Sequence, residues 1–108
     1  MDECVVKYAF DVLNGKWKLH ILWELANQEV IRFNELRRRL NGISNLMLSK
    51  SLQELEMDGV VSRKQYNEIP PRVEYSMTEQ GKELKPILDL MEEWGKSIKQ
   101  SRIEREVY

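Results

Sequence analysis

The chain has 108 residues, of which 42% are hydrophobic and 32% are charged, and its formal net charge is −1. This balance is typical of a soluble globular protein, so we expect one domain over residues 1–108. No apolar run approaches the roughly 18 residues of a membrane span, and the chain start lacks the basic and apolar regions of a signal peptide, which favours a cytoplasmic protein. One cysteine and one histidine can form neither an internal disulfide nor a structural zinc site from those ligand types, and we expect no metal or cofactor.

The charge is distributed unevenly along the chain. Residues 1–31 hold 3 Lys or Arg against 5 Asp or Glu, residues 32–64 hold 7 against 4, and residues 65–108 hold 7 against 9. The three segments therefore carry −2, +3 and −2, so that only the middle third is basic. A local basic region is a modest electrostatic indication of nucleic-acid binding.

Three helices are predicted in the first part of the chain. Residues 4–13 and residues 17–27 carry apolar side chains at helical spacing, and Asn14-Gly15 between them is typical of a left-handed helix end. The stretch RFNELRRRL, residues 32–40, predicts a third helix with its apolar side chains inward and three consecutive arginines at its rim. We expect Arg37 of this rim to contact DNA phosphates, with a purely solvated rim as the alternative.

The segment ISNLMLSKSLQELEMDG, residues 43–59, predicts a fourth helix with two different faces. Ser44 is a good N-cap residue, and a leucine stripe follows on the face that we expect to be buried. The opposite face carries hydrogen-bond donors in its leading half: Asn45, Ser49, Lys50 and Gln53. A short helix, a turn and a second helix of this polarity resemble a helix-turn-helix, whose second helix enters the major groove with its leading residues. Ser44 and these donors are the expected DNA contacts of this helix, although the donors alone would also suit a solvated helix face.

A hairpin and a long last helix are predicted next. Residues 60–66 and residues 72–78 alternate as strands do, and the two prolines between them forbid further pairing. Lys64 and Arg72 on this hairpin are expected to contact the DNA backbone or the minor groove. From Thr78 as its cap, one long helix with a bend at Pro86 is predicted. We therefore expect a mainly helical α+β fold, a winged helix-turn-helix with a long C-terminal dimerisation helix.

The apolar stripe of this last helix is longer than so small a fold needs on one side. We expect part of it to pack against the first helix and a second subunit. The stripe consists of Leu84, Ile87, Leu88, Met91, Trp94 and Ile98.

Several segments, in order and at matching spacing, resemble the HxlR family of bacterial transcription regulators. They are Cys4, LNGKW (residues 13–17), IRFNELRRRL (31–40), GIS (42–44), LSKSLQELEMDGVV (48–61) and PPRVEYSMTEQGKEL (70–84). The resemblance covers about residues 4 to 96. It implies a winged-helix homodimer that binds double-stranded operator DNA and pairs through its first and last helices. It also implies that a cysteine before the first helix senses oxidants or electrophiles in some members. This chain departs from the family at Leu46, where a basic or polar residue is more common.

The expected function is therefore that of a homodimeric, sequence-specific DNA-binding transcriptional regulator. The alternative is a winged helix that docks a partner protein, and binding that weakens steeply with rising salt would favour DNA. An enzyme is not expected, because Gly15-Lys16 lacks the remaining residues of a phosphate-binding P-loop and no nucleophile motif surrounds the single histidine.

Cys4 is the expected redox-sensing residue, with a small oxidant or electrophile as its signal. The start of the first helix and the nearby Lys7 favour a thiolate, whereas the adjacent Asp2 and Glu3 oppose it. These effects are of similar size, so that a cysteine that only packs remains the alternative. With no second cysteine, oxidation can only form a bridge between two subunits or a mixed disulfide with a small thiol.

Overall fold

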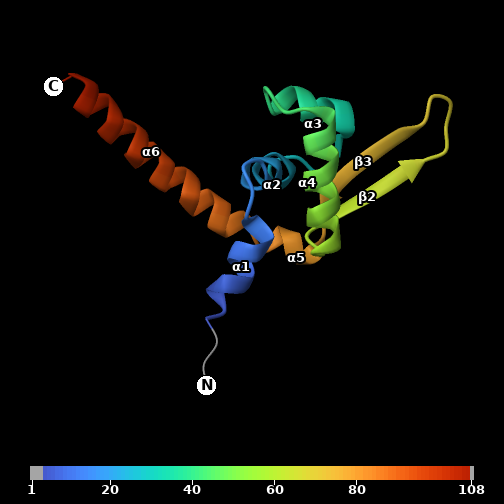
Figure 1. The fold of residues 1–108 in the computed structure, drawn as a ribbon, viewed down its shortest axis with the longest axis horizontal. Coiled ribbons are helices and arrows are strands. Elements are labelled where there is room, and N and C mark those ends of the chain that lie inside the picture. Colours follow the sequence, from blue (N-terminus) through green and yellow to red (C-terminus); the bar gives the residue numbers. More distant parts are fainter. Residues whose placement is uncertain (1–3, 108) are drawn as a thin grey trace.

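The computed structural model describes residues 4–107, with side chains through residue 106 (Figure 1). Asp2 and Glu3, which the sequence sets beside Cys4, lie outside the described residues. The elements follow in the order α1 (Val6–Leu13), α2 (Lys18–Ala26), β1 (Ile31–Arg32), α3 (Phe33–Arg39), α4 (Asn45–Met57), β2 (Val61–Tyr66), β3 (Arg72–Met77), α5 (Glu79–Lys82) and α6 (Lys85–Val107). Within the part of the chain that the structure describes, no helix combines the length and apolar character needed to cross a membrane.

The strands form one antiparallel sheet in the order β1-β3-β2. In the β2–β3 hairpin, Val61 lies opposite Met77 and Tyr66 lies opposite Arg72. The two-residue strand β1 adds Ile31 opposite Tyr75 on the other side of β3, and the sequence analysis did not predict it. Helices α2, α3 and α4 together with this sheet confirm the mainly helical α+β winged-helix fold.

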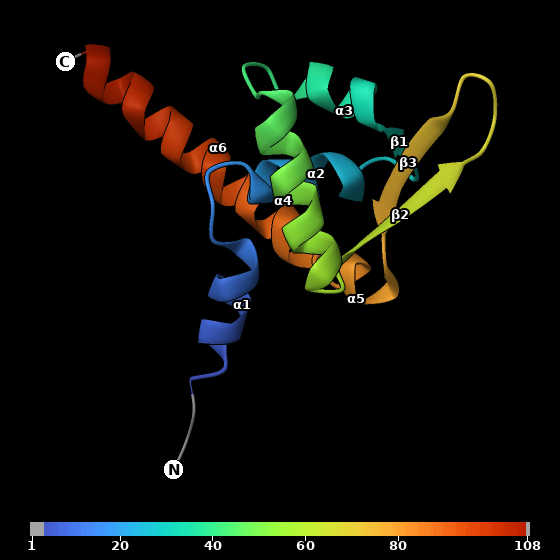
Figure 2. The same cartoon turned by 45° about the vertical axis from the view of Figure 1, so that its right-hand side comes forward.

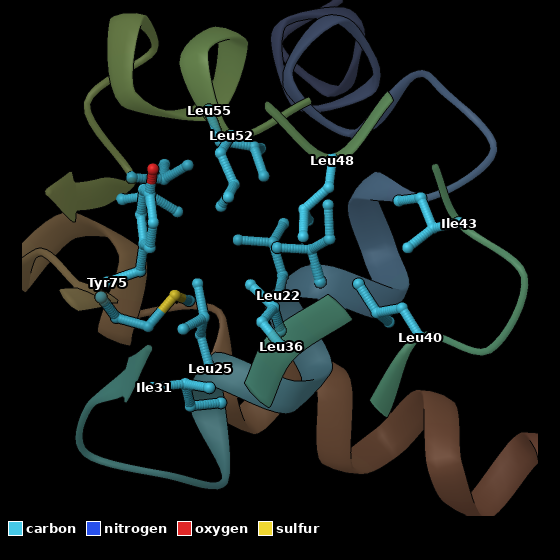
Figure 3. Packing of buried hydrophobic residues seen from close by; sticks show 14 of the residues in the cluster. Leu22, Leu25, Ile31, Leu36, Leu40, Ile43, Leu48, Leu52, Leu55 and Tyr75 are labelled. Atoms are coloured by element: carbon cyan, nitrogen blue, oxygen red, sulfur yellow. The ribbon is translucent and has the colours of Figure 1, made fainter. Parts of the chain in front are cut away.

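The core lies between α2, α3, α4 and the sheet (Figure 3). The predicted leucine stripe of α4 is buried, and it packs with leucines of α2 and α3 and with Tyr75 of β3. Each fully buried leucine side chain contributes about 1.5–3 kcal/mol relative to exposure, so this stripe fixes the rotation of α4 on the body. The stripe consists of Leu48, Leu52 and Leu55.

Two hydroxyl caps begin the helices that flank the hairpin. Ser44 Oγ accepts a hydrogen bond from the backbone N–H of Met47 at 3.0 Å, as its position before α4 predicts. Thr78 Oγ1 accepts one from the backbone N–H of Gly81 at 3.0 Å, and it donates one to the carbonyl of Gly59 at 2.6 Å. Gly59 follows the end of α4 with a φ of +79°, a conformation that glycine adopts without steric cost. Thr78 thereby ties the end of α4 to the start of α5.

The single long last helix predicted from Thr78 is wrong in its first part. The structure has the short helix α5 and then α6, with the break between Lys82 and Lys85. Pro86 explains the break, because its ring would clash with the carbonyl of Lys82 four residues earlier and it has no N–H to donate. In the first turn of α6 the same proline is tolerated. The predicted left-handed end at Gly15 also differs, since its φ of +144° is more extended than that conformation.

Helices α1 and α6 project from the body on the side away from the hairpin (Figures 1 and 2). The radius of gyration is 16.2 Å, compared with about 13 Å for a compact chain of 100 residues. Much of the apolar surface of these two helices is therefore exposed in the part of the chain that the structure describes. Its exposed large side chains are Val6, Tyr8, Phe10, Ile87, Leu90, Met91, Trp94 and Ile103.

Candidate nucleic-acid interface

The leading half of α4 presents the polar face that the sequence analysis singled out. Asn45, Lys50 and Gln53 are exposed and Ser49 is half-buried, while the leucine stripe turns inward. Ser44 is exposed as well, but its hydroxyl oxygen is engaged as the cap of α4. The predicted donors of α4 therefore lie on its exposed side, and the buried leucines on the other side fix their orientation. Unlike Ser44, they do not serve as a helix cap.

The part of this face that carries Ser49 and Gln53 opens on a groove between α3, α4 and the hairpin. One part of the groove has a volume of about 830 Å³ and includes Arg32, Arg38, Ser49, Arg63 and Arg72 in its walls. An adjoining part of about 610 Å³ is lined by Ser49, Gln53, Glu56, Met57, Arg63 and Tyr75. The groove therefore combines donors of α4 with cations of α3, β1 and the hairpin, and it also contains the carboxylates of Glu35, Glu56 and Glu68. The donors and cations are groups that suit a polyanion.

Arg63 is the hairpin cation that faces α4, and it is not among the DNA contacts predicted from the sequence. Val61 is buried against the core, and strand residues alternate in direction, so that Arg63 shares the core-side face and Lys64 points to the other. Arg63 Nη2 donates to Gln65 Oε1 at 3.1 Å, and the side chain is otherwise exposed. Counting in steps of two from the apolar Val61 was the signal that could have identified it.

Arg72 is held by acidic neighbours within the hairpin. Its Nη1 lies 2.6 Å from Glu68 Oε2 and its Nε lies 3.1 Å from Glu74 Oε2. Its guanidinium also stacks 3.9 Å from the ring centroid of Tyr66, and the side chain is only 27% exposed. Lys64 lies on the same face, with Nζ 4.9 Å from that ring. The free protein thus neutralises Arg72 locally, whereas Lys64 is exposed and its ammonium lies over an aromatic ring rather than beside a carboxylate.

The arginine rim of α3 divides into paired and unpaired residues. Arg38 Nη2 lies 2.6 Å from Glu35 Oε2, and Arg39 bridges Glu35 at 3.0 Å and Glu24 of α2 at 3.3 Å. Hydrogen bonds from Arg38 and then Arg39 hold the pKa of the Glu35 carboxyl below its usual range. Arg37 is exposed and has no ion pair among the described residues, while Arg38 rather than Arg37 lines the groove.

An ion pair between a buried lysine and a partly exposed glutamate ties α4 to α2. Lys18 Nζ lies 2.7 Å from Glu54 Oε2, with the lysine side chain 8% exposed and the glutamate 42% exposed. The hydrogen bond from Lys18 lowers the pKa of the Glu54 carboxyl from its usual value, and the charge of Lys50 adds a smaller effect in the same direction. This pair cannot be predicted from the sequence, because charged residues 36 positions apart give no local signal. Glu54 is the neighbour of Gln53, so the pair anchors the helix directly behind its polar face.

Cys4 is exposed and lies just before α1, where its carbonyl accepts a hydrogen bond from the N–H of Lys7 at 3.0 Å. Among the described residues, no group of three or more His, Cys, Asp or Glu side chains is arranged to hold a metal ion.

Comparison with known proteins identifies this arrangement. A family model described as HxlR-like helix-turn-helix matches residues 12–103. A regulatory protein of Fusobacterium mortiferum, MalR, is 45% identical over 93 residues, which cover 86% of this chain and 88% of MalR. The redox regulator HypR in its reduced form superposes with a TM-score of 0.82 at 44% identity, covering 95% of this chain and 98% of HypR. The reduced form of the transcriptional regulator YodB from B. subtilis superposes with a TM-score of 0.74 at 32% identity, covering 87% and 91% of the two chains.

These matches confirm the family predicted from the sequence motifs and the prediction that the chain is not an enzyme, and they favour a DNA-binding regulator over a protein-docking module. The family match spans the helix-turn-helix, the hairpin and most of α6, and the fold of HypR superposes over 95% of the chain. The chain belongs to the HxlR-like helix-turn-helix family of transcriptional regulators.

Proposed function

We propose that the protein reads a specific operator in double-stranded DNA through the polar face of α4. The observation that carries this proposal is the exposed donor face of α4, opening on a groove that also holds Arg63. Lys50 and Gln53 lie one turn apart on that face, so that both can reach base edges in the major groove. Because its ligand would be chromosomal DNA, we also place the protein in the cytoplasm.

The hairpin and the rim of α3 complete the proposed interface. Arg63 would approach the same stretch of DNA as α4, while Lys64 would contact the flanking backbone from the other face of the hairpin. Arg72 would join only by exchanging its two carboxylate partners for phosphate oxygens. Arg37 would reach the backbone beside α3, since its charge is not compensated by an acidic neighbour among residues 4–106.

The test begins with an operator selected in vitro from randomised duplexes. Replacing Lys50 or Gln53 with alanine should reduce discrimination between operator and scrambled DNA by about 1–3 kcal/mol, because each removes a base contact. Gln28→Ala, the same change in the exposed α2–β1 loop outside the groove, should leave discrimination unchanged. Unaltered specificity in both α4 variants, or binding that does not depend on salt, would contradict the DNA-reading surface and favour a protein partner.

We propose further that the protein acts as a homodimer paired through α1 and α6. The exposed apolar side chains of these two projecting helices support this, because a monomer would leave them in water. A two-fold pair would present two copies of α4 to half-sites about 34 Å apart, one turn of DNA.

A charge on α6 tests the dimer. Trp94 is 67% exposed, so Trp94→Asp should leave the monomer fold intact yet give monomers with weakened operator affinity. Gln100→Asp adds the same charge at an exposed polar position of α6 and should retain the dimer. Sedimentation equilibrium with circular dichroism measures both properties. Wild-type protein that is monomeric at micromolar concentration while binding its operator tightly would rule the dimer out.

Cys4 is the proposed oxidant sensor. Support comes from its exposure beside the proposed dimer helix α1 and from HypR, a redox regulator among the similar structures. Two Cys4 thiols of a dimer would be oxidised to one disulfide, releasing two protons and giving two electrons to an oxidant such as diamide. Operator affinity should then change in wild-type protein and stay constant in Cys4→Ser. An equal response of the two proteins, or no response in either, would remove the sensor and leave the DNA-binding proposal in place.

A further inference from the structure

Leu46 is an exposed apolar side chain on the stripe of α4 that also carries Lys50 and Gln53. It lies in the first turn of α4 and is 81% exposed. Lys50 and Gln53 follow it by four and seven residues, so that the three side chains share one stripe of the helix. The stripe lies opposite the buried leucines, which turns Leu46 outward in the same direction as the two proposed base readers.

The position of Leu46 is fixed by the structure around it. The Ser44 cap holds the first turn through Met47, and Leu48 is fully buried directly behind it. Leu46 therefore projects from a rigid part of the helix. A single exposed leucine is ordinary on a protein surface, but here it stands where helix-turn-helix proteins place the residues that first enter the major groove.

We infer that Leu46 contacts the 5-methyl group of a thymine in each operator half-site. This inference rests on the proposed entry of α4 into the major groove. The edges of the four base pairs in that groove consist of hydrogen-bond donors, acceptors and one apolar group, the thymine methyl. A leucine side chain can neither donate nor accept a hydrogen bond, so among these groups it complements only the methyl. The contact gains its energy by removing two apolar surfaces from water, and it involves no proton transfer or covalent step.

The size of the effect follows from the group that is buried. Burial of one methyl-sized group changes a binding constant about fourfold, so each half-site that loses its thymine methyl should bind about fourfold more weakly. Deoxyuridine provides the matched change in DNA, because it keeps every hydrogen-bonding group of thymine and lacks only the methyl.

The experiment measures dissociation constants for operators in which each thymine is replaced in turn by deoxyuridine. Wild-type protein should bind about fourfold more weakly per half-site when one particular thymine is replaced. Leu46→Ala should bind the thymine and deoxyuridine operators equally, and Leu46→Met should retain the discrimination because it keeps an apolar side chain of similar length. Unchanged thermal unfolding of both variants, expected from the exposure of Leu46, shows that the fold is intact.

Three results would overturn the inference. If wild type binds its operator specifically and Leu46→Ala still discriminates thymine from deoxyuridine as wild type does, or if wild type discriminates at no thymine, Leu46 does not read a methyl group. If wild type does not distinguish operator from scrambled DNA, the proposed DNA-reading surface itself is wrong and the role of Leu46 falls with it.

Discussion

Substitution of Gly81 by alanine should destabilise the protein, although this exchange normally stabilises a helix. Gly81 is buried in α5, and a Cβ atom added there would lie 2.1 Å from the carbonyl oxygen of Val60. Ordinary C···O contacts begin near about 3.3 Å, so the two groups must separate by more than about 1 Å. That carbonyl belongs to the backbone and accepts a hydrogen bond from the N–H of Thr78 at 3.1 Å, while the N–H of Val60 donates to the carbonyl of Leu55. The segment cannot retreat without breaking these contacts.

The cost of this overlap exceeds the gain in helix propensity. Alanine in place of glycine gains about 0.5–1 kcal/mol within a helix, whereas forcing extra atoms into a packed region costs about 1–3 kcal/mol or more. We expect a net loss in the free energy of unfolding, with the midpoint temperature lower by about 4–8 °C for each kcal/mol lost.

Gly95 provides the matched control, because it lies in α6 and a Cβ added there meets nothing within 4 Å. Gly95→Ala should raise the free energy of unfolding by up to about 1 kcal/mol. Thermal and urea unfolding followed by circular dichroism measure both variants, at one protomer concentration because dimerisation would add to apparent stability. A stabilising shift in Gly81→Ala equal to that of Gly95→Ala would refute the reasoning.

Two further predictions concern the groove and the helix behind it. Glu54→Gln should lower the free energy of unfolding more than Lys18→Met does, because the first leaves a buried ammonium unpaired and the second leaves a carboxylate that water can reach; urea unfolding that ranks them in the opposite order would contradict this. The pKa of Glu54 is lowered in the folded protein from its usual value of 4.5. The stability that this ion pair contributes is therefore present at pH values above 4.5 and is lost as the pH falls below 4.5 and the carboxylate becomes protonated. Glu54→Gln should make the free energy of unfolding less dependent on pH in this range. At the hairpin, Lys64→Ala should lower affinity for all DNA sequences and reduce the slope of log affinity against log salt concentration by about one unit. Arg63→Ala should do the same and should also relax specificity. Identical salt slopes and specificities in the two variants would argue against the assigned faces.

The sequence determined most of the helices and the hairpin, because their signals are local. The Ser44 cap marks the start of α4 and the glycine after Asp58 marks its end, and each acts within one turn of the helix. The leucine stripe of α4 repeats with the period of the helix itself. The two prolines between the strands likewise restrict the chain at that point. Such features can be identified without knowledge of distant residues. The structure accordingly has the polar face of α4 where the sequence predicts it.

Contacts between distant segments decided the rest. Strand β1 is too short for any alternation and exists because Ile31 and Arg32 pair with β3. Lys18 and Glu54 become partners only when α2 and α4 pack together, and the arginines of α3 become paired or free according to which carboxylates surround them. The sequence supplied the charges of the hairpin, but the tertiary structure decided which way they point. Because Val61 is buried in the core, Arg63 on the same strand face is turned toward α4, and Arg72 on the opposite face lies between two glutamates. The physical reason is that a strand that buries one face exposes the other.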